Sequence, residues 1–376
     1  MTRSTVVLAA CPDYDPDRVL GVVRESIAKL GFSLPSDGKT VLLKPNMLRA
    51  ATAEKAVTTH PAVFAAAGRY FKDLGRRVAF GDSPNAAFKE HAVAERSGLL
   101  EAADALGMPL VDFEAGEDVS FPAGVQNRRF HVASAVMKSH VVNMPKLKTH
   151  ALATMTGALK NTFGVVPGIL KPEFHIKHPD VEGFSRMIVD LNRLVKPALV
   201  IMDAIHAMEG NGPGAGTVVK LGLLLFSTDP VAVDAVACRL IGVDPLSLPM
   251  LRFAEETGLG HASEQGIRIV GEDVGAVAAK SFALPFRGPP GAGVPDFLMR
   301  FARNRFVPKP VVDKTKCRRC GECVKACPTA PKSIQANGGI PKYTYRSCIR
   351  CYCCQEVCPH GAISVKVPLA RGLLGR

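Results

Sequence analysis

The sequence from Cys317 to Pro328 reads CRRCGECVKACP, and the sequence from Cys348 to Pro359 reads CIRCYCCQEVCP. Both stretches follow the pattern Cys-x-x-Cys-x-x-Cys-x-x-x-Cys-Pro. The two copies begin 31 residues apart, and nine of the eleven cysteines of the 376-residue chain lie within or between them. This repeated spacing decides the fold of the carboxyl-terminal part of the chain.

Three closely spaced cysteines and a distant fourth form the bacterial ferredoxin pattern for [4Fe–4S] clusters, in which the fourth cysteine of each run ligates the other cluster. The short loops aim successive sulfurs at neighbouring irons, and the distant cysteine closes the cube from the opposite side. We therefore predict two [4Fe–4S] clusters as cofactors, held in a small α+β ferredoxin-like domain. The first set is Cys317, Cys320, Cys323 and Cys358, and the second set is Cys348, Cys351, Cys354 and Cys327.

Other interpretations of the cysteines are weaker. Structural zinc takes four ligands, commonly as two separated pairs, and would leave several thiols without a role. Disulfide frameworks belong to exported proteins, and the apolar stretch at residues 6–11 is too short for a secretory signal. Cys353 lies outside the repeated pattern. It is interpreted as a small buried residue, with a redox or alternative-ligand role as the other hypothesis.

The positive charge of the chain is concentrated around the same motifs. Residues 301–376 hold fifteen Lys and Arg against three acids, and so carry +12 of the net charge of +13. Such a surface would steer an acidic redox partner, such as a ferredoxin or flavodoxin, toward the clusters. Nucleic acid is not the expected partner, because few aromatic residues accompany the basic ones and the chain has no Trp.

The rest of the chain alternates short β-branched runs with helical patterns. Strands are expected at residues 5–10, 40–43, 77–80, 132–137, 141–144, 198–202 and 221–226, and helices at 17–30, 61–74, 154–163 and 229–241. This alternation predicts an α/β domain over residues 1–282, with a largely parallel sheet layered with helices. A Pro- and Gly-rich linker at 283–310 and a cluster domain with a basic tail at 311–376 complete the predicted organisation.

Polar side chains at the strand ends form the candidate ligand site. Lys146, Lys148 and His150 fall on one side of an extended segment. Open α/β sheets place their ligand crevice at the carboxyl ends of parallel strands. We predict a pocket for a small anion, a carboxylate or a phosphate, formed by Lys44, Asn46, Lys146, Lys148 and His150, with Asp82 or Asp203 as the catalytic candidate that transfers protons. A solvated basic face is the competing interpretation.

Two further patterns carry less weight. His140 and His150 would form a minor metal site at most. Residues 209–216 read EGNGPGAG, which lacks the Gly-Lys-Ser/Thr ending of a phosphate-binding loop and precedes a predicted strand. We expect a connecting loop or lid there.

Several strings in the first 280 residues carry a family resemblance. They are LLKPN at 42–46, TTHP at 58–61, GDSP at 81–84 and the run 141–168. They resemble the family called "domain of unknown function 362", whose members often carry a C-terminal ferredoxin module. The resemblance implies an iron–sulfur protein but supplies no agreed reaction. Only the eight cluster cysteines transfer, and they do so from the ferredoxin pattern.

Two functional hypotheses follow. The first is a redox enzyme whose α/β domain binds a small anionic substrate. The second is a non-catalytic electron carrier or maturation partner that docks another protein. A buried pocket that opens toward the clusters favours the first, and a flat apolar surface favours the second. No apolar run approaches the roughly 20 residues of a membrane helix, so we expect no membrane span and a cytoplasmic location.

Overall fold

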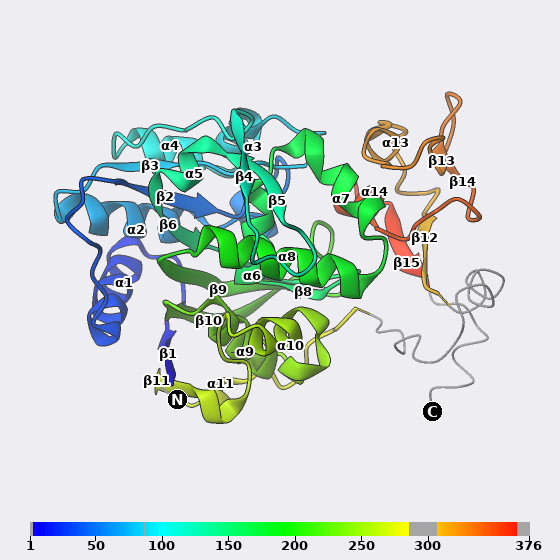
Figure 1. The fold of residues 1–376 in the computed structure, drawn as a ribbon. Helices are drawn as coiled ribbons and strands as arrows, with labels where there is room; N and C mark the ends of the chain where they lie inside the picture. Colours follow the sequence, from blue (N-terminus) through cyan, green and yellow to red (C-terminus); the bar gives the residue numbers. More distant parts are fainter. Residues whose placement is uncertain (1–2, 86, 286–306, 367–376) are drawn as a thin grey trace.

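The computed structural model describes residues 3–85, 87–285 and 307–366, and Figure 1 shows a large α/β domain with a small cysteine-rich domain beside it. The predicted linker lies mostly outside the described residues, as does the basic tail beyond residue 366. No helix in the described part of the chain has both the length and the apolar character that crossing a bilayer requires.

A nine-stranded sheet forms the centre of the large domain. Its main path is β11-β1-β10-β9-β6-β2-β3, while β7 pairs with β9 and β8 pairs with β7. The strands are β1 (Ser4–Ala10), β2 (Thr40–Pro45), β3 (Val78–Phe80), β6 (Ser139–Met144), β7 (Lys146–His150), β8 (Thr154–Thr156), β9 (Leu199–Glu209), β10 (Thr217–Ser227) and β11 (Ile267–Gly271). Five of the eight pairings are parallel; β1–β10, β9–β10 and β7–β8 are antiparallel. The predicted mainly parallel α/β sheet is confirmed.

Helices cover both faces of this sheet, because alternate strand residues enter two different cores. Along β1, Val6 and Leu8 pack into one core and Val7 into the other. The core around Val7 is covered by α1 (Pro16–Leu30), α2 (Pro61–Asp73), α3 (Glu90–Ser97) and α4 (Leu99–Asp104). The opposite core is covered by α6 (Ala158–Asn161), α8 (Val181–Val195), α9 (Pro230–Leu240) and α10 (Pro249–Glu256).

Shorter elements complete the large domain. They are β4 (Gly116–Ser120), β5 (Arg129–Ala133), α5 (Ser134–Met137), α7 (Lys171–Lys177), α11 (Val274–Val277), and the 3-10 helices η1 (Ala53–Lys55), η2 (Thr162–Val165), η3 (Gly168–Leu170), η4 (Pro245–Ser247) and η5 (Glu264–Gly266). Strands β4 and β5 form an antiparallel pair separate from the main sheet.

Two expected elements are wrong in part. The expected strand at 132–137 ends at Ala133, where α5 begins. The expected helix at 154–163 is a short strand β8, then α6, then η2. Strand β8 is extended because it pairs with β7, and α6 begins only where the carboxylate of Asp234 accepts hydrogen bonds from the backbone N–H groups of Ala158 and Leu159.

The small domain consists of two short antiparallel pairs and two single-turn helices. Strand β12 (Lys309–Val312) pairs with β15 (Ile363–Lys366), and β13 (Ile334–Gln335) pairs with β14 (Lys342–Tyr343). Helix α13 (Glu322–Lys325) follows the first two cysteines of one motif, and α14 (Cys353–Glu356) occupies the same place in the other. The arrangement is the expected small α+β fold.

The β9–β10 loop of the large domain forms hydrogen bonds with the small domain. The Nε2 group of Gln355 donates to the carbonyl oxygens of Asn211 and Gly212, at 3.0 and 2.9 Å. Asn211 Nδ2 in turn donates to the carbonyl of Ile363 at 3.1 Å, and Arg49 donates to that of Gly214. The glycine-rich segment is therefore a connecting loop, and it contacts α14 directly.

Candidate functional site

Each predicted set of four cysteines lines one cavity of the small domain. One cavity of about 350 Å³ is bounded by Cys317, Cys320, Cys323 and Cys358, and a second of about 310 Å³ by Cys327, Cys348, Cys351 and Cys354; both volumes include space open to solvent. None of the eleven cysteines forms a disulfide in this structure. Among the described residues no three His, Cys, Asp or Glu side chains form a group that could hold a single metal ion. The sulfurs surround two volumes instead.

Backbone geometry explains how the short loops aim these sulfurs. Arg319 and Arg350, at the same position of the two motifs, both have positive φ, +56° and +64°. Gly321 and Tyr352 follow with φ of +80° and +62°. Left-handed residues at both places turn the chain tightly between and after the first two cysteines, at a cost for the non-glycine residues.

Polar groups around the cavities suit cluster ligation. Tyr343 Oη donates to Cys354 Sγ at 3.2 Å, and the backbone N–H of Ala362 donates to Cys358 Sγ at 3.3 Å. Hydrogen bonds to ligand sulfurs are among the protein's means of tuning iron–sulfur centres. Eight thiols in two groups of four, with donors beside them, therefore fit two [4Fe–4S] clusters.

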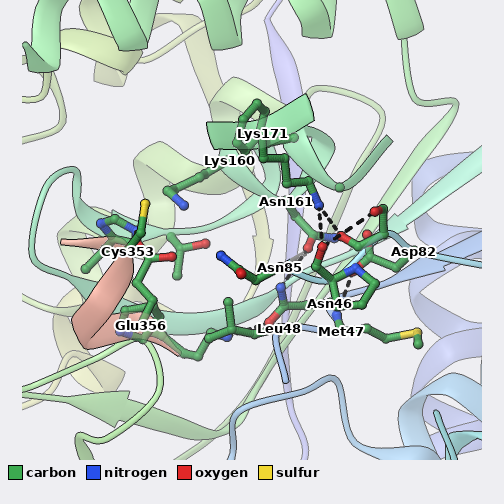
Figure 2. Close-up of a pocket in the computed structure, with 18 of the residues that line it drawn as sticks. Asn46, Met47, Leu48, Asp82, Asn85, Lys160, Asn161, Lys171, Cys353 and Glu356 are labelled. Carbon is green, nitrogen blue, oxygen red and sulfur yellow. Dashed lines mark hydrogen bonds and ion pairs between the residues drawn. The ribbon is translucent and has the colours of Figure 1, made fainter. Parts of the chain in front are cut away.

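A third cavity lies where the two domains meet, and we call it the interdomain pocket (Figure 2). It measures about 710 Å³, including space open to solvent. The large domain contributes Asn46, Asp82, Lys148, His150, Lys160, Lys171 and His175, among others, and the small domain contributes Ala326, Cys353 and Glu356. Figure 2 shows Cys353 and Glu356 at one end of the pocket and Asp82 at the other.

Positive groups dominate the wall from the large domain. Lys160 is half-buried, and Figure 2 shows its ammonium group within the pocket. Lys171 Nζ donates to the carbonyl oxygens of Ser83 and Pro84, and burial lowers its pKa to about 8. Burial also lowers the pKa of His175 to about 4, so this imidazole is neutral at pH 7.

His150 links this wall to the small domain. Its Nδ1 accepts hydrogen bonds from the backbone N–H groups of Leu152 and Ala153, at 3.1 and 3.2 Å, so the ring hydrogen is on Nε2. Nε2 lies 2.8 Å from Oε1 of Glu356, although the two groups are poorly aligned for a hydrogen bond. Burial opposes ionisation of Glu356, but His150 and Lys160 lower its pKa to about 2.

Two of the predicted anion-binding lysines are already paired with carboxylates. Lys44 Nζ lies 2.7 Å from Asp82 Oδ1, and both groups are buried. Asp82 Oδ2 accepts a bond from the backbone N–H of Met47. Lys146 Nζ lies 2.8 Å from Asp203 Oδ2, and neither lines the interdomain pocket. The structure therefore divides the predicted residues between two places.

The second place is a closed polar network, defined here as Tyr14, His60, Lys146 and Asp203. Tyr14 Oη accepts from Lys146 Nζ at 2.8 Å and donates to Asp203 Oδ1 at 3.0 Å. The backbone N–H of His60 donates to Asp203 Oδ2, and the ring of His60 stacks on Tyr14 at 3.5 Å between centroids. Each charge in this network has its partner within the protein.

The minor metal hypothesis has no support in the placement of the two histidines. His140 Nε2 lies 2.9 Å from Asp37 Oδ1 near the start of β6. His150 ends β7 and contacts Glu356 instead.

Comparison with known proteins identifies both domains. A family model described as "Domain of unknown function (DUF362)" matches residues 41–239, more than half of the chain. The chain belongs to the DUF362 family. A model described as "4Fe-4S dicluster domain" matches residues 309–359. This DUF362 protein is therefore an iron–sulfur protein.

Two relatives and one solved structure are similar to parts of the DUF362 protein. The Thylakoid-associated protein sll1697 of Synechocystis sp. is 35% identical over 266 residues, which is 69% of this chain and 82% of that protein. An uncharacterized ferredoxin of Methanocaldococcus jannaschii, MJ0722, is 37% identical over 59 residues, 15% of this chain and 77% of that protein. The lactate racemase apoprotein of Thermoanaerobacterium thermosaccharolyticum aligns with a TM-score of 0.37 and 12% identity, over 62% of this chain and 56% of the racemase.

Sequence reasoning missed four residues that line the interdomain pocket of the DUF362 protein. They are Lys160, Lys171, His175 and Glu356. The first three lie in residues 138–178, a segment dense in Lys and His that also contains the predicted Lys146 and Lys148, so the density of positive residues was a signal for them. Glu356 had no such signal, because only the docking of the small domain brings it to His150.

Proposed function

We propose that this DUF362 protein is an iron–sulfur oxidoreductase that transfers electrons to or from a small anionic substrate in the interdomain pocket. The observation that carries the proposal is the composition of the pocket wall. One end is formed by Cys353 and Ala326, which adjoin the predicted cluster ligands Cys354 and Cys327 in sequence. The remainder is rich in lysine and histidine.

The proposal assigns different roles to the two cysteine sets. We call Cys327, Cys348, Cys351 and Cys354 the inner set, because Cys327 and Cys354 are next in sequence to two residues of the pocket wall; the outer set is Cys317, Cys320, Cys323 and Cys358. Each set would hold one [4Fe–4S] cluster, whose chemistry when bound is one-electron transfer.

Side chains of the large domain would bind and orient the substrate. Lys160 and Lys171 supply positive charge, and neutral His175 can donate or accept a hydrogen bond. Of the two proton-transfer candidates, Asp82 lines the pocket and remains proposed, although its oxygens are bonded to Lys44 and Met47. Asp203 lies in the closed network and is no longer a candidate for direct transfer to the ligand.

The outer set would face the electron-transfer partner. Cys320 is exposed, and so are Lys316, Arg318 and Arg319 around it. A positive rim at an exposed cluster ligand suits an acidic partner such as a ferredoxin or flavodoxin. Free thiols and an oxygen-sensitive type of cofactor also suit the reducing cytoplasm.

The competing hypothesis is an electron carrier or maturation partner without a substrate of its own. It predicts a flat apolar surface at the strand ends. A polar, basic hollow at that position supports the enzyme instead.

An anaerobic screen tests the proposal. Small carboxylates and organic phosphates are tested for an increase in melting temperature, and each compound that stabilises the protein is mixed with dithionite-reduced protein. At least one stabilising compound should reoxidise the clusters, and Lys171→Met should slow that reaction. If no compound both stabilises the protein and exchanges electrons with it, the carrier hypothesis replaces the enzyme.

A further inference from the structure

Three lysines are fully buried on two strands of the sheet. Lys44 is on β2, and Lys146 and Lys148 are on β7; each side chain is about 1% exposed. An ammonium group removed from water is costly unless a carboxylate compensates its charge. Lys44 has Asp82 at 2.7 Å, and Lys146 has Asp203 at 2.8 Å.

Lys148 is the exception among the three. Its Nζ donates to Asn46 Oδ1 at 2.5 Å and to the carbonyl of Val57 at 2.6 Å, and both acceptors are neutral. Within the described ranges no carboxylate forms an ion pair with Lys148, and Glu356 contacts His150 instead. The buried nitrogen therefore has hydrogen-bond partners but, among the described residues, no carboxylate at ion-pair distance.

One position on this nitrogen remains after the two donated bonds. In an ammonium group it is a third N–H, and in a neutral amine it is the lone pair. Lys148 is one of the residues that line the interdomain pocket, whereas Lys146 is not. A negatively charged ligand in the pocket can therefore give Lys148 the ion-pair partner that Lys44 and Lys146 have within the protein.

We propose that the pocket's ligand carries an oxyanion, a carboxylate or a phosphate, which supplies the missing counter-charge at Lys148, and that its binding takes up one proton. The inference rests on the proposed function and names its substrate class. The step is balanced: the neutral amine gains one proton from solvent and becomes the ammonium group that pairs with the oxyanion.

The surroundings of Lys148 support a neutral amine in the free protein. Burial, together with the positive charges of Lys160 and Lys146, holds its pKa well below the usual range. The charged and titratable groups around it are Lys146 and His150 on its own strand, Arg49 in the segment after β2, Lys160 on α6 and Glu356 on α14. Glu356 alone among these favours protonation, and an oxyanion would add a second negative charge.

Calorimetry on the intact, cluster-loaded protein tests the inference. Sulfate and succinate serve as probes, because neither titrates above pH 7, and each is measured in two buffers of different ionisation enthalpy. Wild-type protein should take up about one proton per bound anion at pH 7.5. Lys148→Met should bind about 10- to 100-fold more weakly, the range for a hydrogen bond to a charged group, and its proton uptake should fall to the small fraction that Lys171, with a pKa of about 8, can still take up.

A matched variant separates a specific role from general positive charge. Lys160→Met removes a half-buried lysine of the same pocket and should weaken binding, while the proton count should stay close to one because burial, the largest cause of the lowered pKa of Lys148, is unchanged. Binding of a probe by wild type without proton uptake overturns the inference but leaves the proposed pocket intact, and so does unchanged affinity in Lys148→Met. If neither probe binds wild type, the pocket and the inference both fail. The number of protons that wild-type protein takes up tests the inference even if Lys148→Met does not fold.

Discussion

Lys146 and Lys148 are two residues apart on β7, yet their ammonium groups have different surroundings. Lys146 is enclosed by Asp203 and Tyr14, and every charge in that network is compensated. Lys148 has only the neutral oxygens of Asn46 and Val57, and it faces the interdomain pocket. Position at a strand end is therefore not what separates a structural lysine from a ligand-binding one.

Two neighbouring elements account for the different surroundings of Lys146 and Lys148. Strand β9 brings the carboxylate of Asp203 to Lys146 and closes that network. In the part of the chain that the structure describes, no strand brings a carboxylate to Lys148; instead the small domain covers that region through α14. Strand β7 therefore contributes to stability through Lys146 and, in our proposal, binds the ligand through Lys148. The predictions below test this contrast.

The largest effect is expected from removing a predicted ligand of the inner cluster. Cys327→Ala should prevent assembly of the inner cluster, and iron should fall from about eight to about four per chain. Cys353→Ala should keep all the iron, because Cys353 lies outside both sets. Iron and acid-labile sulfide analysis after anaerobic reconstitution measures both variants. Equal losses in the two variants would assign Cys353 to the ligands and contradict the proposed sets.

The next effect concerns stability. Lys146→Met leaves Asp203 buried and without its ion-pair partner, which should cost about 3–5 kcal/mol. Lys148→Met removes a buried amine without an ion-pair partner but leaves the carbonyl of Val57 without its donor, so the free energy of unfolding should fall by less, about 1–3 kcal/mol. Anaerobic urea unfolding without added anions compares the two variants. A larger loss in Lys148→Met would mean that Lys148 is the structural lysine.

The pH dependence of anion binding gives a third test. Lys171 has a pKa of about 8, and as pH rises through that value the pocket loses a positive charge. Above pH 8, a rise of one pH unit should therefore lower sulfate affinity by up to about tenfold more than the same rise does below pH 8. The charged and titratable groups near Lys171 are Lys44, Asp82, Glu114, Lys160 and His175.

Lys171→Arg is the control for that slope, because arginine stays protonated throughout this range. The variant should bind sulfate with the same slope above and below pH 8, which is the slope that proton uptake at Lys148 alone produces. A break at pH 8 that persists in Lys171→Arg would assign the titration to another group.

The smallest effect is expected at Lys160. This lysine is half-buried, so water screens its charge, and Lys160→Met should weaken sulfate binding about two- to fivefold. The same titration on Lys29→Met, at an exposed lysine of α1 outside the pocket, serves as the baseline. A loss larger than that in Lys148→Met would make Lys160 the main anion ligand.

The cysteine sets could be predicted because their information is local. Ferredoxin spacing is repeated within 42 residues, and the structure lines one cavity with each set. Helix α1 is equally local: the side chain of Asp15 accepts from the backbone N–H of Arg18, Pro16 begins the helix and Gly31 ends it with φ of +62°.

The pocket could be predicted only in part, because its members are joined by contacts distant in sequence. Asn46, Lys148 and His150 line it as expected, but Lys44 and Lys146 do not. Asp82 and Asp203, which pair with those two lysines, are 38 and 57 residues from them. A sequence shows that a lysine is at a strand end but not whether a distant carboxylate will reach it.

The central claim is that an anion binds beside the inner cluster, and a redox titration followed by electron paramagnetic resonance tests it most directly. Both cluster potentials are measured in intact protein with and without saturating sulfate. A bound negative charge disfavours reduction of a nearby centre more than of a distant one. One potential should therefore fall while the other stays nearly constant, and Lys148→Met should abolish the change at the same sulfate concentration. Two potentials that do not move, or that move together, would contradict the account.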